Sequence, residues 1–153
     1  MALAEADIVF IGITNPDPES CKPNASSAHR HQPESNPFTF WERQSMIQAA
    51  LEHKSLQGRC RVVPFPLDRP QVWSSYIPLD ATQFVRVFTD WERDKVKVLQ
   101  DGGYPLRVIE GDPAHAVRAI NIRRALIQGD EEGWRPLVPD GVGAAMPTRM
   151  SPQ

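Results

Sequence analysis

The chain has 153 residues and a formal net charge of −2, with 41% hydrophobic and 24% charged residues, which is ordinary for one globular domain. This charge provides no basic field for nucleic acid or an anionic membrane, and no run reaches the roughly 18 apolar residues of a membrane span. Two cysteines form neither a disulfide framework nor a zinc site, and no signal-peptide pattern is present, so we expect a cytoplasmic protein with free thiols.

Four short runs have the composition of β-strands. They are residues 7–14 (DIVFIGIT), 59–64 (RCRVVP), 84–89 (FVRVFT) and 105–109 (PLRVI). Continuous apolar runs are typical of strands that are buried on both faces in a parallel sheet.

Three helices are predicted between and after these strands, at residues 39–54, 91–100 and 118–128. Their apolar residues recur with helical spacing, and glycines follow the last two helices as stop signals. Strands that alternate with helices indicate an α/β domain with right-handed crossovers. We assign residues 1–142 to this domain and residues 143–153, which are small and polar, to a disordered tail.

Two long loops follow strand ends, at residues 15–36 and 64–82. Long loops in a compact domain are often functional, and loops after parallel strands line the ligand crevice. Trp73 and Tyr76 in the second loop are either a stacking platform for a base or the loop's own small core. The His-x-His pair in residues 29–32 lacks a third ligand, so we predict no metal site there.

Thr39 and Glu42 form a T-x-x-E capping box at the start of the first long helix. Capping is a sufficient explanation for both residues. Arg43 is different, because it lies on the sheet-facing stripe in the first helical turn. A guanidinium there needs an anion, which is either a phosphate at the helix N-terminus or a salt-bridge partner in Glu42, Glu34 or a neighbouring loop.

Charged and aromatic residues also mark the later helices. Asp90 is predicted to cap the second helix, which places Trp91 beside the crevice, to stack on a base or simply to pack. Lys95, one turn further along, either reaches a phosphate or stays solvated. Of the adjacent pair Arg123 and Arg124, one is expected to face solvent and the other to point across the crevice.

The segments GIT, NPFTFWERQSMIQAAL and INIRRALIQGDEEGWRPLVPDGV, taken together, resemble nicotinamide-mononucleotide adenylyltransferases of the HxGH nucleotidyltransferase superfamily. The resemblance covers residues 6–142. The forms VPFPLDRP and TDWERDK are also similar to a bacterial branch that includes phosphonate cytidylyltransferases. The resemblance implies a Rossmann-like three-layer domain with a mostly parallel sheet.

The implied reaction transfers AMP or CMP from ATP or CTP, with Mg²⁺, and releases pyrophosphate. The acceptor would be nicotinamide or nicotinate mononucleotide, as in NAD biosynthesis, or a phosphonate of a natural-product pathway. By resemblance, Arg123 would hold the triphosphate, Trp73 and Trp91 would lie near the acceptor or its base, and Thr39 and Arg43 would shape the crevice. The remaining residues expected to bind nucleotide or acceptor are Gly12, Thr14, Asp90, Lys95 and Arg124.

Two departures from the family pattern lie on the triphosphate side. The family opens with a βα unit carrying G.F.P.H.GH, which would precede Met1, and no H-x-G-H occurs in the 153 residues. In the terminal motif, Arg118 and Ile120 stand where the family has Ser and Thr. We therefore expect weak or absent turnover from this chain, and sheet edges that favour homo-oligomers.

Three alternatives stay open at this point. The chain is a nucleotidyltransferase domain, or a non-catalytic remnant that binds a nucleotide or a partner protein. A small flavodoxin-like signalling domain ranks last, because it does not explain the two long aromatic loops.

Overall fold

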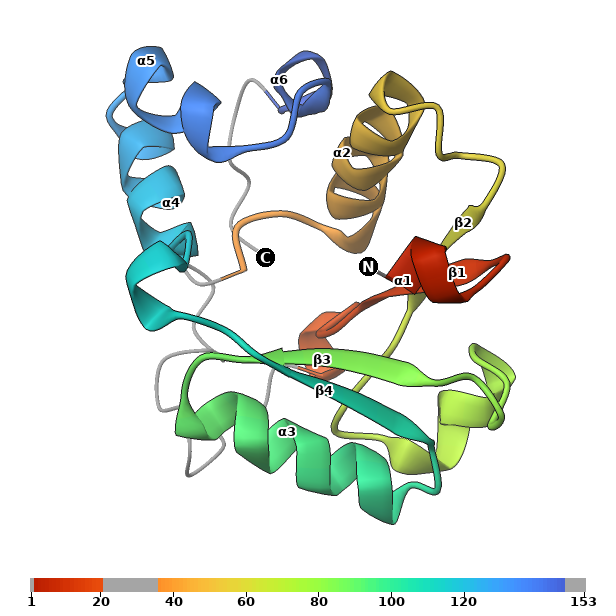
Figure 1. Cartoon of the computed structure of the whole chain (residues 1–153). Helices are drawn as coiled ribbons and strands as arrows, with labels where there is room; N and C mark the ends of the chain where they lie inside the picture. The colour runs from red at the N-terminus through yellow and green to blue at the C-terminus, as the bar shows by residue number, and fades with distance from the viewer. Residues whose placement is uncertain (1, 21–35, 148–153) are drawn as a thin grey trace.

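The computed structural model describes residues 2–20 and 36–147, in which strands alternate with helices (Figure 1). The strands are β1 (Val9–Ile13), β2 (Cys60–Pro64), β3 (Gln83–Val87) and β4 (Leu106–Glu110). The α-helices are α1 (Ala2–Glu5), α2 (Phe40–His53), α3 (Asp90–Asp101), α4 (Ala119–Ile127), α5 (Glu131–Trp134) and α6 (Val142–Ala145). Short 3₁₀ turns are η1 (Pro18–Ser20), η3 (Pro70–Ser75), η4 (Pro113–His115) and η5 (Arg135–Leu137). The four predicted strands and three predicted long helices are confirmed, each within two residues at both ends.

The strands form two parallel pairs. β1 pairs with β2 from Val9 opposite Cys60, and β3 pairs with β4 from Gln83 opposite Leu106. The α/β class and the parallel pairing are therefore confirmed, but in the described residues the sheet exists as two separate two-stranded sheets. Between β1 and β3 lies a cavity of about 590 Å³, which we call the inter-sheet gap.

The largest core lies beside β3 and is aromatic. Trp73 is only 1% exposed, its ring stacks on Phe65 with centroids 5.2 Å apart, and its indole N–H donates to the carbonyl of Pro66 at 2.6 Å. The hydroxyl of Tyr104 donates to the carbonyl of Ile77 at 2.8 Å. The long loop 64–82 therefore folds back on the sheet and contributes Trp73 to the buried core. This agrees with the second of the two alternatives for Trp73, a residue of the loop's own core.

Capping boxes fix the starts of the two long helices. At α2, the Thr39 hydroxyl accepts from the Glu42 amide, and the Glu42 carboxylate accepts from the Thr39 amide at 2.7 Å, as predicted. At α3 the cap is Thr89 and not Asp90, so the prediction for Asp90 is wrong. The reason is reciprocity: Thr89 has Glu92 three residues later, whereas Asp90 is followed at that spacing by a basic residue, which cannot accept a hydrogen bond.

The C-terminal boundary also differs from the prediction. The short helix α6 runs across the expected start of the tail at Gly143, and it packs against α2 with Val142 buried. Gly141 allows this approach, because its φ is +91° and a Cβ there would lie 2.6 Å from the carbonyl oxygen of Ala49. The rest of the predicted tail, residues 148–153, lies outside the described residues, as does the His-x-His pair. Within the described ranges, no helix is long and apolar enough to cross a membrane.

Candidate nucleotide-binding site

A second cavity, of about 290 Å³, lies where the end of β1, the start of α2 and the start of α4 meet. We call it the arginine pocket. Its lining residues are Thr14, Asn15, Asn36, Arg43, Arg118, Ala119, Ile120 and Arg123. Three guanidinium groups and, among the described residues, no carboxylate line it, so this lining suits an anion.

Arg43 connects α2 to the end of β1. Its Nη1 donates to the carbonyl of Thr14 at 2.8 Å, and its Nη2 donates to the carbonyl of Asn15. Asn15 has a φ of +51°, a left-handed conformation that asparagine tolerates better than most residues. Backbone carbonyls of the neighbouring loop thus accept two hydrogen bonds from Arg43. The prediction that Arg43 needs an anion stays a prediction, since Glu34, one of the carboxylates considered for it, lies outside the described residues. Arg43 still contributes positive charge to the pocket wall.

The N-terminus of α4 forms the opposite wall. Arg118 occupies the N-cap position, and its side chain makes no capping hydrogen bond. The helix is nine residues long, so its first amides and its dipole present partial positive charge to the pocket beside Ala119 and Ile120. A helix N-terminus next to guanidinium groups is a favourable environment for phosphate.

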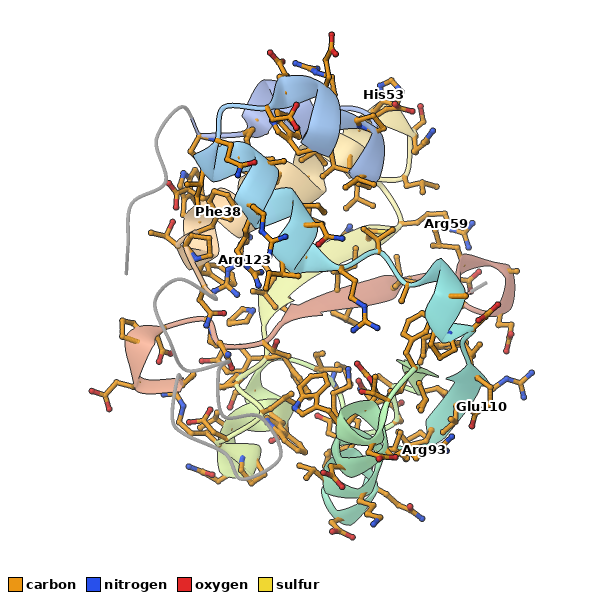
Figure 2. The ribbon with its side chains drawn as sticks, turned by 90° about the vertical axis from the view of Figure 1, so that its left-hand side faces the viewer. Phe38, His53, Arg59, Arg93, Glu110 and Arg123 are labelled. Carbon is orange, nitrogen blue, oxygen red and sulfur yellow. The ribbon has the colours of Figure 1, made fainter. Side chains whose placement is uncertain are left out.

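Arg123 is the half-buried cation of this pocket. Burial lowers the pKa of its guanidinium from the ordinary value, although an arginine remains protonated at neutral pH. In the described part of the chain, no carboxylate forms an ion pair with it. Arg93 differs, since it pairs with Glu110 at 3.2 Å on the exposed surface, far from Arg123 (Figure 2). A partly desolvated guanidinium that pairs with no described carboxylate is chemically suited to an anionic ligand.

The donor set fits phosphate oxygens and does not fit a metal ion. Mg²⁺ prefers oxygen ligands, commonly carboxylates together with substrate phosphates, and the described lining of the pocket supplies no carboxylate. Among residues 2–20 and 36–147, no group of three or more His, Cys, Asp or Glu side chains could hold a metal. A magnesium ion would therefore belong to the nucleotide substrate and not to the described residues.

The arginine pocket brings together three of the predicted site residues, Thr14, Arg43 and Arg123. Gly12 and Lys95 line the inter-sheet gap instead, and Thr14 lines both cavities. Of the adjacent arginines, Arg123 faces the pocket and the exposed Arg124 does not line it, which agrees with the expectation that the two would face different ways.

The remaining predicted residues lie elsewhere. Thr39 caps α2, as described above. Trp73 is buried in the core and does not present its ring for stacking, which corrects its predicted place near a base. Asp90 and Trp91 line neither cavity, and the ammonium of Lys95 lies 5.5 Å from the centroid of the Trp91 ring.

Sequence reasoning missed Arg118, Asn15 and Asn36 as lining residues. Arg118 was interpreted only as the loss of a hydroxyl donor. The signal that could have revealed it is its position one residue before a predicted helix, where a cation next to the first amides strengthens an anion site.

Comparisons with known proteins identify the family of this chain. The chain is 36% identical over 135 residues to phosphonoformate cytidylyltransferase of Streptomyces viridochromogenes. The aligned region covers 88% of this chain and 72% of that protein. The chain belongs to this nucleotidyltransferase family. Nicotinamide-nucleotide adenylyltransferases of Thermococcus onnurineus and Pyrococcus horikoshii are each 29% identical over 140 residues, covering 91% of this chain and 67% of each relative.

No family model matches the sequence. The membership therefore rests on the individual relatives, which are enzymes of nucleotidyl transfer by name. The membership in a nucleotidyltransferase family and the α/β fold, which the sequence motifs implied, are both confirmed.

Proposed function

We propose that this nucleotidyltransferase transfers CMP from CTP to a small phosphonate and releases pyrophosphate. The observation that carries the proposal is the arginine pocket, with half-buried Arg123 beside the N-terminus of α4. An oxygen of the acceptor attacks the α-phosphorus of CTP, the bond from that phosphorus to the bridging oxygen breaks, and the electron pair leaves on pyrophosphate. Charge grows on this leaving group, and in this proposal Arg118, Arg123 and the α4 amides neutralise it.

Two observations favour a small phosphonate as the acceptor. The relative with 36% identity is a phosphonoformate cytidylyltransferase, whereas the adenylyltransferase relatives are 29% identical. Trp73, the tryptophan of the loop that resembles a base-stacking loop, is buried and stacks on Phe65 instead. An acceptor without an aromatic ring does not need that platform. Mg²⁺ is part of the proposal only as an ion that arrives with the triphosphate.

Adenylyl transfer to nicotinamide mononucleotide is the second candidate. It is favoured by the longer match to the adenylyltransferases, which covers 91% of this chain.

The two candidates are separated by supplying the purified chain with CTP or ATP, each with phosphonoformate or nicotinamide mononucleotide, in the presence of Mg²⁺. Pyrophosphate release and the mass of the product are followed over hours, because we expect slow turnover from these 153 residues. CTP with phosphonoformate is expected to give the fastest release. Faster release from ATP with nicotinamide mononucleotide would refute the phosphonate proposal, and nucleotide binding with no product in any mixture would indicate a non-catalytic binder.

A further inference from the structure

The backbone of Asn15 is unusual for a residue that follows a strand. Its φ is +51°, although Pro16 comes next and the residue before a proline favours an extended conformation. In the described ranges, the other residue besides glycine with a positive φ is Ser55. Ser55 lies in the turn that ends α2, where a left-handed residue is common. Asn15 ends no helix, so its conformation calls for another explanation.

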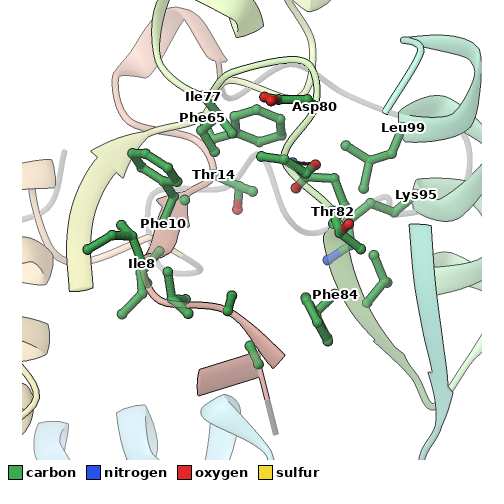
Figure 3. Close-up of a pocket in the computed structure, with 18 of the residues that line it drawn as sticks. Ile8, Phe10, Thr14, Phe65, Ile77, Asp80, Thr82, Phe84, Lys95 and Leu99 are labelled. Atoms are coloured by element: carbon green, nitrogen blue, oxygen red, sulfur yellow. Dashed lines mark hydrogen bonds between the residues drawn. The ribbon is translucent and has the colours of Figure 1, made fainter. Parts of the chain in front are cut away.

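The chain brings Asn15 to the arginine pocket. Thr14 follows β1 and lines both cavities, and Figure 3 shows it at the inter-sheet gap, beyond Ile8 and Phe10. Of these two cavities, Asn15 lines the arginine pocket alone. An anion held by the three guanidinium groups of this pocket would therefore lie close to Asn15.

Two arginines anchor the segment that contains Asn15. Arg43 of α2 donates to the Asn15 carbonyl. Arg69, in the loop after β2, donates through Nη2 to the carboxylate of Asp17 and to the hydroxyl of Ser20, the latter at 2.8 Å. The Asp17 carboxylate also accepts from the Ser20 amide at 2.9 Å. The left-handed residue is thus fixed between two anchor points, one on each side of it in the chain.

The carboxamide of Asn15 is not used by this turn. Asparagine at a turn commonly forms a hydrogen bond with a nearby backbone group, but within residues 2–20 and 36–147 the Asn15 carboxamide forms none. The backbone conformation alone would be met at less cost by glycine. Asn15 is half-buried, so its side chain keeps a donor for a ligand. In a pocket lined by three cations, the matching acceptor is an anion.

We propose that Asn15 is a further substrate-binding residue, whose carboxamide NH₂ donates to an oxygen of a phosphate or phosphonate in the arginine pocket, and that Arg69 is the residue that positions it. This inference rests on the proposed function, because it requires an oxyanion substrate in that pocket. A neutral donor adds no charge to the three guanidinium groups, so its contribution is to fix the orientation of the bound oxyanion.

The first test compares Asn15→Gly with the unaltered chain by titration calorimetry with tripolyphosphate and, separately, with phosphonoformate. Glycine accepts the left-handed backbone and removes only the carboxamide. We expect the Kd to rise about tenfold or more with an unchanged urea midpoint. Asn15→Asp should weaken binding further, because it places a carboxylate beside the anion. Ser55→Gly is the matched control, since it alters a left-handed residue that lines neither cavity, and it should leave both Kd values unchanged.

The two probes identify the source of the oxyanion. A loss for tripolyphosphate assigns Asn15 to the triphosphate, and a loss for phosphonoformate assigns it to the acceptor. Unchanged Kd values for both probes in Asn15→Gly, or a loss of affinity that accompanies a lower urea midpoint, would overturn the inference alone. An unaltered chain that binds neither probe would overturn the proposed function together with the inference.

The second test separates positioning by Arg69 from general stability. Arg69 lines neither cavity, yet Arg69→Met should raise the Kd for the same probe about threefold or more, and Arg69→Lys should be intermediate. In the Asn15→Gly background, Arg69→Met should have no further effect on the Kd, because the side chain that it positions is absent. Additive losses would overturn the positioning role. Asp17→Asn weakens the same link from its other side, and it takes the place of Arg69→Met if that variant does not fold.

Discussion

Replacing Arg123 by alanine should weaken nucleotide binding without weakening the fold. Its guanidinium is half-buried, and in the described residues it pairs with no carboxylate. A hydrogen bond to a charged group contributes about 1.5–3 kcal/mol, so the loss of one such contact should weaken binding about 10- to 150-fold. Because burial penalises this cation in the free protein, its removal should leave the free energy of unfolding unchanged or slightly higher.

The assay is titration calorimetry with CTP and, separately, with tripolyphosphate, which lacks the base and sugar. Arg124→Ala is the matched control, since it removes an exposed arginine that does not line the pocket and should change Kd less than about threefold. Arg123→Lys should be intermediate, because it keeps the charge and loses the planar fork. Urea unfolding of each variant gives the stability comparison. Equal losses of affinity for both alanine variants, or a clear loss of stability for Arg123→Ala, would refute the assignment of Arg123 to the triphosphate.

Three further predictions concern the stability of the fold. Arg43→Lys should lower the free energy of unfolding by about 2–3 kcal/mol, because two charge-assisted bonds to carbonyls at the end of β1 are lost. Urea unfolding measures this change, and an unchanged midpoint would contradict the prediction. Trp73→Phe should cost about 1–3 kcal/mol, because a buried carbonyl loses its donor, whereas Trp41→Phe, at a side chain 69% exposed, should change stability by less than about 0.5 kcal/mol. Burial raises the pKa of Asp17, but hydrogen bonds from Arg69 and Ser20 outweigh it and hold the pKa below its usual value. Above the ordinary pKa this contribution to stability is complete, and it is lost as pH falls through the lower pKa of the folded state, so Asp17→Asn should flatten the decline in stability below about pH 4.

Local signals in the sequence were sufficient for the four strands and the three long helices. The start of α2 is fixed by Thr39 and Glu42, which lie three residues apart and need nothing from the rest of the fold. Glycines that follow α3 and α4 have positive φ angles, +85° at Gly103 and +69° at Gly129. A glycine in this left-handed conformation ends a helix through its own backbone and the hydrogen bonds of the last turn, so the sequence nearby is enough to predict it.

Side-chain partners that depend on distant segments could not be predicted in the same way. Arg43 binds the carbonyls of Thr14 and Asn15, almost thirty residues earlier, and Asn15 has a left-handed backbone that the sequence does not announce. The burial of Trp73 depends on Phe65 and Tyr104, which close around it only in the folded chain. The inter-sheet gap was anticipated as exposed sheet edges, but its shape and its lining needed coordinates.

The most direct test of the proposed function is the mass of the product that the chain forms from CTP, phosphonoformate and Mg²⁺, with Arg124→Ala as an active control and Arg123→Ala as the impaired variant. The account predicts a cytidylyl-phosphonoformate product that accumulates with an equal amount of pyrophosphate, more slowly in Arg123→Ala. A product that forms only from ATP and nicotinamide mononucleotide, or an equal rate of product formation in Arg123→Ala, would contradict it.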